Sequence, residues 1–195
     1  MGRAVRNGDT LFADKDNRMI DFVETPISGV WVIHSEKAMD ERGYFRRLYC
    51  QKRFAEKKIN FTPQQDSISH NAVAGTLRGM HFQHQPSEEQ KFISCLRGKV
   101  YDVVVDLRKD SSTYKKWFCA ELSPENGLGL FVPKGLAHGF ITLEDNTDVL
   151  YQIEGLYNPA AASGIRWDDP AFGINWPRKP AVLSDRDKKW PDYVV

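Results

Sequence analysis

Short apolar runs separated by turn residues most limit what this chain of 195 residues can fold into. Each run is too short for a core helix, and the longest is rich in β-branched residues. We expect strands over residues 29–33, 43–49, 91–96, 100–107, 117–122, 128–132, 139–143 and 148–153. Strands at this spacing, without long helical segments between them, predict an antiparallel sandwich or barrel.

Three local patterns refine this expectation. Residues 100–107 are so continuously apolar that we expect the strand to be covered on both faces. The turn Arg97-Gly98-Lys99 lies between two runs and predicts a hairpin that joins them. Residues 51–58 are the best candidate for a short helix, with Phe54 on its apolar side.

The length fits a single domain with a real core. Residues 1–18 are polar and charged, and we expect a flexible N-terminal arm there. Residues 19–195 would then form one domain. Its tail after residue 157, rich in Pro, Trp and Asp, would wrap the barrel as ordered loops.

Charge and hydropathy exclude several classes of partner. The chain has 27 basic and 26 acidic residues, so we expect no broad nucleic-acid-binding surface. No segment approaches the roughly 20 apolar residues needed to span a bilayer, and no secretory signal is recognisable. Three widely spaced cysteines form no CxxC pair, which is typical of free thiols in a reducing compartment. We therefore expect a cytoplasmic protein with no membrane partner.

The segment Pro133-x-Gly135-x-x-His138 matches the second half of the cupin signature. Proline and glycine would make the turn, and the following strand would direct His138 into the barrel. Combined with the strand pattern, this motif predicts an all-β, cupin-type antiparallel jelly-roll barrel with a few short helices.

Metal binding is common among cupins but is disfavoured here. The metal signature needs an HxH pair, whereas this chain has His81-Phe82-Gln83-His84. Residues three apart in a strand point to opposite faces, so both histidines cannot face one ion. His81 and His138 alone are too few ligands for a stable site. The sequence therefore predicts no metal.

Five polar residues supply a set of groups for acid–base chemistry: Arg78, His81, Lys91, Tyr151 and Asp187. Four of them have an ordinary structural interpretation: a core histidine, a strand-end lysine, a core tyrosine and a turn aspartate. Together they provide a base, cationic stabilisers, an acid and an orienting carboxylate. That set suits proton transfer next to a carbonyl group of an anionic substrate.

The order of the motifs resembles the dTDP-4-dehydrorhamnose 3,5-epimerase family, from about residue 20 to residue 187. The matching segments are 40–45, 65–67, 77–83, 103–108, 122–126, 133–140, 167–170, 174–177 and 183–184, with Lys91 at the expected distance after 77–83. So many segments in one order make a specific match.

The resemblance implies a role for each matching residue. His81 would be the catalytic base, Asp187 its paired carboxylate, Tyr151 the proton donor and Lys91 the stabiliser of the enolate. The candidate substrate-binding residues are Arg42, Arg47, Gln65, Ser67, Arg78, Lys91, His138 and Arg186.

The family further implies a metal-free and cofactor-free homodimer with strand exchange between subunits. The expected reaction is inversion at C3, C5 or both of a nucleoside-diphosphate-4-keto-6-deoxy sugar, in the biosynthesis of deoxysugars and polysaccharides such as lipopolysaccharide. The alternatives are a single-centre epimerase on a non-dTDP nucleotide sugar, a non-catalytic sugar-nucleotide-binding cupin, and a metal-dependent oxygenase. The missing HxH pair argues against the oxygenase.

Four positions depart from the family pattern at the expected nucleotide end. Arg47 replaces a glutamate, Ser67 an asparagine, Ala162 an acidic residue and Leu156 an aromatic one. These changes remove acceptors and a stacking ring, and they add a donor-rich guanidinium. We therefore predict a relaxed or altered preference for the nucleotide base.

Overall fold

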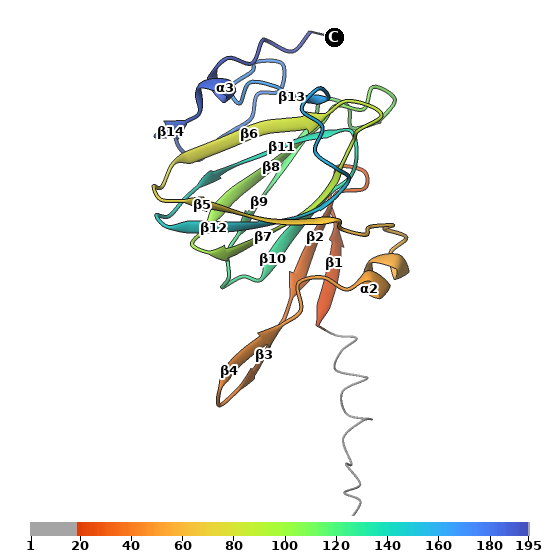
Figure 1. Cartoon of the computed structure of the whole chain (residues 1–195), viewed down its shortest axis with the longest axis vertical. Helices are drawn as coiled ribbons and strands as arrows, with labels where there is room; N and C mark the ends of the chain where they lie inside the picture. Colours follow the sequence, from red (N-terminus) through yellow and green to blue (C-terminus); the bar gives the residue numbers. More distant parts are fainter. Residues whose placement is uncertain (1–18, 195) are drawn as a thin grey trace, which may run out of the picture.

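The computed structural model describes residues 19–194, so the arm expected over residues 1–18 lies outside the described part of the chain. Two antiparallel sheets face each other in this part (Figure 1). In spatial order, the first sheet contains β1 (Ile20–Glu24), β2 (Trp31–Ser35), β10 (Leu128–Val132), β7 (Gln90–Arg97), β12 (Thr147–Glu154) and β5 (Gln65–Asn71). The second contains β13 (Ala162–Gly164), β6 (Thr76–Gln83), β11 (Leu136–Thr142), β8 (Val100–Asp106) and β9 (Trp117–Leu122), with β14 (Val182–Leu183) parallel to β6.

The remaining elements are short. A hairpin of β3 (Lys37–Asp40) and β4 (Gly43–Arg46) projects from the barrel, and the helices are α2 (Gln51–Glu56) and α3 (Asp185–Lys188). The all-β jelly-roll barrel of the cupin type, with a few short helices, is thus confirmed. No helix within residues 19–194 is long and apolar enough to cross a membrane.

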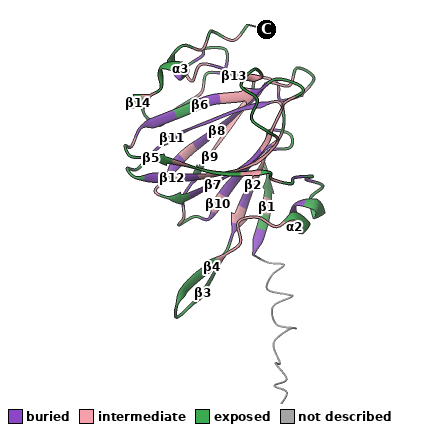
Figure 2. Cartoon of the chain, viewed as in Figure 1, coloured by how far each residue is buried: buried purple, intermediate pink, exposed green. Residues whose placement is uncertain are grey.

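Apolar side chains from both sheets meet in the barrel interior. Ile93 and Val149 of the first sheet belong to the same buried cluster as Val104 and Phe140 of the second. Successive strand residues point to opposite faces, so Val103 and Val105 face outward, where Ile165 and Phe172 of the C-terminal segment cover them. Figure 2 shows β8 buried along most of its length. The expectations of a doubly covered strand and a wrapping tail are therefore confirmed.

The hairpin predicted at residues 97–99 is wrong. β7 pairs with β10 and β12, whereas β8 pairs with β11 and β9, so the turn carries the chain from one sheet to the other. Gly98 has a φ of +73°, and a Cβ there would lie 2.3 Å from Oγ1 of Thr147. A glycine suits both a hairpin turn and a turn that connects two sheets, so the local sequence could not distinguish these two connections.

Other boundaries shift by a few residues. The strand expected at 29–33 begins at Trp31, because Thr25 accepts and donates hydrogen bonds in the preceding turn. The helix expected at 51–58 ends at Glu56, and Lys58 has a φ of +60°. Phe54 is fully buried against the outer face of the first sheet, as expected. β5 and β6 were not expected as strands.

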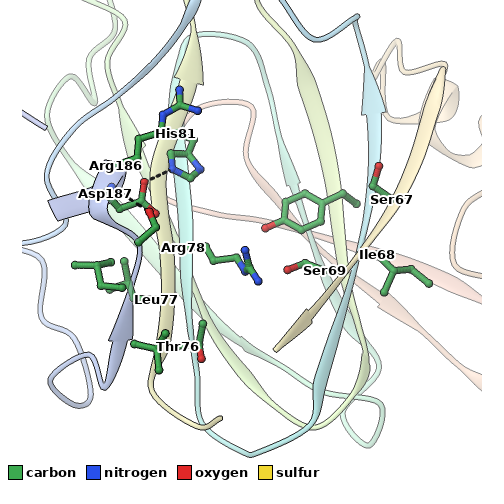
Figure 3. Close-up of a pocket in the computed structure, with 13 residues that line it drawn as sticks. Ser67, Ile68, Ser69, Thr76, Leu77, Arg78, His81, Arg186 and Asp187 are labelled. Carbon is green, nitrogen blue, oxygen red and sulfur yellow. Dashed lines mark hydrogen bonds and ion pairs between the residues drawn. The ribbon is translucent and has the colours of Figure 1, made fainter. Parts of the chain in front are cut away.

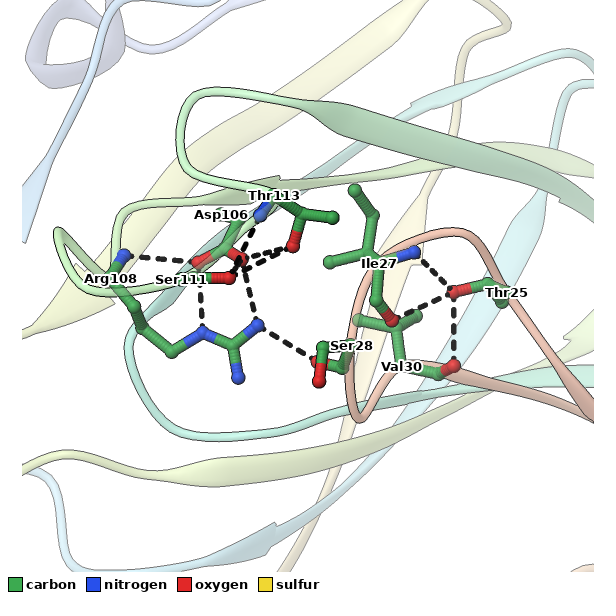
Figure 4. Close-up of polar contacts among 8 residues, drawn as sticks. All are labelled: Thr25, Ile27, Ser28, Val30, Asp106, Arg108, Ser111 and Thr113. Carbon is green, nitrogen blue, oxygen red and sulfur yellow. Dashed lines mark hydrogen bonds and ion pairs between the residues drawn. The ribbon is translucent and has the colours of Figure 1, made fainter.

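A buried carboxylate fixes the loop after β8. Asp106 accepts hydrogen bonds from Nε and Nη2 of Arg108 at 2.8 Å and from the hydroxyls of Ser111 and Thr113 (Figure 4). Nη2 of Arg108 also donates to the carbonyl oxygen of Ser28 in the turn before β2. Burial opposes ionisation of Asp106, but these donors outweigh it and lower its pKa to about 2. This network holds the two sheets together at one end of the barrel.

Candidate active site

A cavity of about 520 Å³ opens between the two sheets beside α3 (Figure 3). It is lined by Ser67, Ile68, Ser69, Thr76, Leu77, Arg78, His81, Tyr151, Val182, Leu183, Ser184, Arg186 and Asp187. These residues come from β5 and β6, from β12, and from residues 182–187, which include β14, the N-cap residue Ser184 and the start of α3. These three regions are far apart in the sequence. The fold thus brings most of the predicted acid–base residues into one cavity.

His81 and Asp187 form a hydrogen-bonded pair at one wall. Nε2 of His81 lies 2.6 Å from Oδ1 of Asp187, and Figure 3 shows the two side chains pointing toward each other. Ser184 caps α3 by accepting a hydrogen bond from the Asp187 backbone N–H, and the Gly79 backbone N–H donates to Oδ2 of Asp187. The carboxylate is therefore held from several sides.

The surroundings of Asp187 favour its ionised form. Burial alone would raise the pKa of the carboxyl, but the hydrogen bond and charge of His81 and the Gly79 N–H outweigh it, so the pKa is lowered. An ionised Asp187 accepts a hydrogen bond from the Nε2–H group, which leaves Nδ1 of His81 as the basic ring nitrogen. About two fifths of the His81 side chain is exposed, so a ligand can reach it.

Tyr151 lines the cavity from the opposite sheet. It lies on β12, whereas His81 lies on β6, so base and phenol stand on opposing walls. Burial raises the pKa of Tyr151, the negative charge of Asp102 raises it further, and the charge of Arg78 opposes both. The phenol is therefore protonated at neutral pH and available as a proton donor.

Two arginines give the cavity positive charge. Nε of Arg78 donates to Oδ1 of Asn71 at 2.8 Å, and Nη2 donates to the carbonyl oxygen of His70. Both acceptors are neutral, and no carboxylate of residues 19–194 lies within ion-pair distance of Arg78. Arg186 also lines the cavity, with its guanidinium 5.1 Å from the ring of Trp190. The cavity is thus suited to an anion.

Lys91 and His138 lie deeper in the barrel and do not line the cavity surface. Nε2 of His138 is 3.0 Å from both carboxylate oxygens of Asp102, and its ring lies 5.8 Å from that of Tyr151, centroid to centroid. Nζ of Lys91 lies 2.7 Å from Oε1 of Glu89. A layer of ionisable groups behind the cavity surface therefore packs near the wall that carries Tyr151.

Sequence reasoning missed Asp102 and Glu89. Asp102 is fully buried, and burial raises its pKa, against the lowering effects of His138 and of the charge of Lys91. The sequence does carry a signal for Asp102, because this residue interrupts the otherwise apolar run 100–105 of a strand that we expect to be covered on both faces. A charged residue there needs a buried partner. For Glu89, in a run of polar residues, no such signal exists.

Besides Lys91 and His138, three further predicted substrate-binding residues lie outside this cavity. Arg42 is at the tip of the projecting hairpin, where its side chain is 84% exposed and pairs with Asp40. Nε2 of Gln65 donates to the carbonyl oxygen of Gly155 at 2.6 Å, and Arg47 is half-buried after β4. Within residues 19–194 of one chain, these three side chains do not line the cavity that contains His81 and Asp187.

The other substituted positions differ in their relation to the cavity. Ser67 lines it, whereas Leu156 is exposed and Ala162 is half-buried in β13. Among residues 19–194, no group of three or more His, Cys, Asp or Glu side chains is arranged to hold a metal ion. Independence from metal stays a prediction.

Comparison with known proteins identifies the relatives of this chain. Residues 24–194 match the family model described as dTDP-4-dehydrorhamnose 3,5-epimerase. The enzyme of that name from Sinorhizobium fredii is 43% identical over 171 residues, 87% of this chain and 88% of the relative.

Solved structures agree with this match. The crystal structure of dTDP-4-dehydrorhamnose 3,5-epimerase from Bacillus anthracis with TDP and PPi bound has a TM-score of 0.86 and 38% identity, covering 89% of this chain and 99% of that chain. A dTDP-6-deoxy-D-glucose-3,5-epimerase from Legionella pneumophila in complex with dTDP-4-keto-L-rhamnose has a TM-score of 0.81 and 33% identity, covering 90% of this chain and 100% of that one. The chain therefore belongs to the dTDP-4-dehydrorhamnose 3,5-epimerase family.

Proposed function

We propose that this protein is an epimerase that inverts C3 and C5 of a nucleoside-diphosphate-4-keto-6-deoxy sugar. The observation that carries the proposal is the His81–Asp187 pair facing the half-buried phenol of Tyr151 across one cavity. The family membership and the dTDP-linked keto sugar held by the Legionella relative support the substrate class.

The reaction begins with removal of a proton next to the ketone. In a 4-keto sugar, C3 and C5 are both alpha to the carbonyl group, so their protons are the acidic ones. Nδ1 of His81 removes such a proton, while Asp187 holds the tautomer and stabilises the imidazolium that forms. The electron pair moves onto the C4 oxygen and gives an enolate.

Positive charge stabilises the enolate, and Tyr151 completes the inversion. We assign the stabilising charge to Lys91. Residues two apart in a strand share a face, and Ile93 of β7 faces the barrel interior, so Lys91 faces the interior as well. Tyr151 returns a proton to the carbon from the opposite face, because it lies on the opposing sheet. Delivery on the face opposite to abstraction inverts the centre.

Arginines hold the nucleotide diphosphate. Arg78 and Arg186 both line the cavity, and guanidinium groups bind phosphate through paired hydrogen bonds. Ser67 adds a hydroxyl, and His138 supports Tyr151 from the barrel interior. Arg42, Arg47 and Gln65 would contribute at the nucleotide end.

A homodimer would explain why Arg42 lies far from the cavity. The β3–β4 hairpin exposes Met39, Tyr44 and Phe45, an apolar group on a thin projection (Figures 1 and 2). If two chains exchange these hairpins, Arg42 reaches the partner's site. We expect sedimentation equilibrium to give twice the mass of 22.3 kDa, and Phe45→Asp to shift the mass toward one chain. A monomeric wild type would contradict strand exchange.

The base preference provides a separate prediction. Arg47, Ser67, Leu156 and Ala162 alter the expected nucleotide end, and each mismatched polar group costs about 1–3 kcal/mol. We therefore expect dTDP, CDP, GDP and UDP to bind with affinities much closer to each other than in a thymidine-specific enzyme. Isothermal titration of the four nucleotides measures this. A strong preference for dTDP would refute the prediction and leave the proton chemistry untouched.

The proposed activity is tested with the purified protein after exhaustive treatment with EDTA. A dTDP-linked 4-keto-6-deoxy hexose is added, and the proton–proton couplings of the product report the configuration at C3 and C5. We expect inversion at both centres without added metal. Inversion at one centre would identify a single-centre epimerase, and turnover only after metal addition would contradict the metal-free mechanism.

The cytoplasmic location stays a prediction.

A further inference from the structure

A buried ion pair lies where β7 begins. Nζ of Lys91 is 2.7 Å from Oε1 of Glu89, and only 9% and 12% of the two side chains are exposed. A buried ammonium without a counter-charge strongly destabilises a protein, because its lost hydration is not replaced. Glu89 therefore supplies the counter-charge of Lys91 inside the barrel.

The second carboxylate oxygen of Glu89 ties this pair to the neighbouring elements. Oε2 accepts a hydrogen bond from Nε2 of Gln83 at 3.1 Å, and Oε1 of Gln83 accepts one from the Asn158 backbone N–H at 2.7 Å. Gly155 packs so closely that a Cβ there would lie 3.2 Å from Cβ of Glu89. The end of β6, the start of β7 and the loop after β12 are thus joined at Glu89.

Lys91 also interacts with a second carboxylate. Asp102 is fully buried, and this burial raises its pKa, whereas His138 and the positive charge of Lys91 favour its ionised form. An ammonium released from Glu89 would be drawn toward Asp102. In the described structure the Lys91 ammonium lies against Glu89, and Asp102 is a second negative charge that would attract it.

We propose that Glu89 is a positioning residue of the active site, whose carboxylate fixes the ammonium of Lys91 where the enolate oxygen forms. This rests on the proposed epimerase function and extends it to a residue that does not line the cavity. A preorganised charge stabilises a transition state without reorganisation, and a displacement of about 1 Å costs on the order of 10²-fold in rate.

The first test is Glu89→Gln, which keeps the shape and removes the charge. We expect kcat to fall about 10- to 100-fold, with KM nearly unchanged, because the enolate exists only after substrate has bound. Glu89→Asp keeps the charge and should restore part of kcat. The matched control is Glu88→Gln, since the neighbouring carboxylate faces Gly135 and another pocket, and it should leave both parameters unchanged.

A double-mutant cycle separates positioning from a general structural role. In a Lys91→Met background there is no ammonium to position, so adding Glu89→Gln should leave the residual kcat unchanged. If Glu89→Gln alone does not fold, the double variant can still be compared with Lys91→Met. The double variant has neither the buried ammonium nor the buried carboxylate, so it leaves no unpaired charge. Wild-type turnover is measured first. Its absence would refute the epimerase function and, with it, this inference, whereas an active wild type lets the Glu89 variants test the inference alone.

Three outcomes with an active wild type would overturn the inference. Glu89→Gln could match the wild type, which would mean that Lys91 needs no anchor. It could raise kcat, which would mean that Glu89 only weakens the charge of Lys91. Finally, it could lower kcat by the same factor in the Lys91→Met background, which would mean that Glu89 acts independently of Lys91.

Discussion

Replacement of His81 with asparagine is expected to abolish exchange of the C3 and C5 protons of the keto sugar with solvent. The variant keeps a side-chain amide that can hydrogen-bond to Asp187, but it has no group that accepts a proton at neutral pH. General base catalysis contributes about 10²–10⁴-fold, so the exchange rate should fall by at least that range. Proton NMR of the substrate in deuterated water measures the exchange directly.

The matched control for this variant is His84→Asn. His84 lies three residues after His81 and directly after β6, is exposed and does not line the cavity, so its replacement should leave the exchange rate unchanged. Circular dichroism of both variants checks the fold. Near-wild-type exchange in His81→Asn would mean that His81 is structural and that the base lies elsewhere.

Replacement of Tyr151 with phenylalanine is expected to separate proton removal from inversion. The ring remains and still packs near His138, but the acidic hydroxyl is lost from the cavity. His81 can still remove and return the proton on its own face, so deuterium should enter while inversion falls by about 10²-fold or more. The measurement compares deuterium content with product configuration in one NMR time course.

Tyr101→Phe is the control for the loss of a hydroxyl. Tyr101 belongs to the outward-facing cluster of the second sheet, where its hydroxyl donates to the carbonyl oxygen of Asn175, so its loss should not affect epimerisation. If Tyr151→Phe inverts both centres at the wild-type rate, water or another side chain is the proton donor.

The strands that sequence could predict are those that bury apolar residues. Residues 100–107 and 128–132 were expected and correspond to β8 and β10, because their side chains fill the core. β5 and β6 escaped prediction because their inward faces are polar. Ser67 and Ser69 of β5 and His81 of β6 line the cavity, so the apolar alternation that marks a half-buried strand is missing.

It was harder to predict which residues contact one another in the fold than to predict which residues belong to the site. Asp187 and His81 are 106 positions apart, and only the resemblance to a family paired them before the fold was known. Nothing in the local sequence shows that Lys91 meets Glu89 and not Asp102, since both carboxylates lie within a short stretch of chain. The projecting hairpin that carries Arg42 likewise has no apolar pattern that would show how far it lies from the cavity.

Deuterium content at the inverted carbons tests the central claim most directly. The wild-type protein is incubated with a dTDP-linked 4-keto-6-deoxy hexose in deuterated water, and product is analysed by proton NMR before the reverse reaction contributes. If His81 removes each proton and Tyr151 supplies another from the opposite face, every inverted centre carries deuterium. Inverted product that retains its original protons would contradict the mechanism, and unchanged substrate would contradict the proposed function.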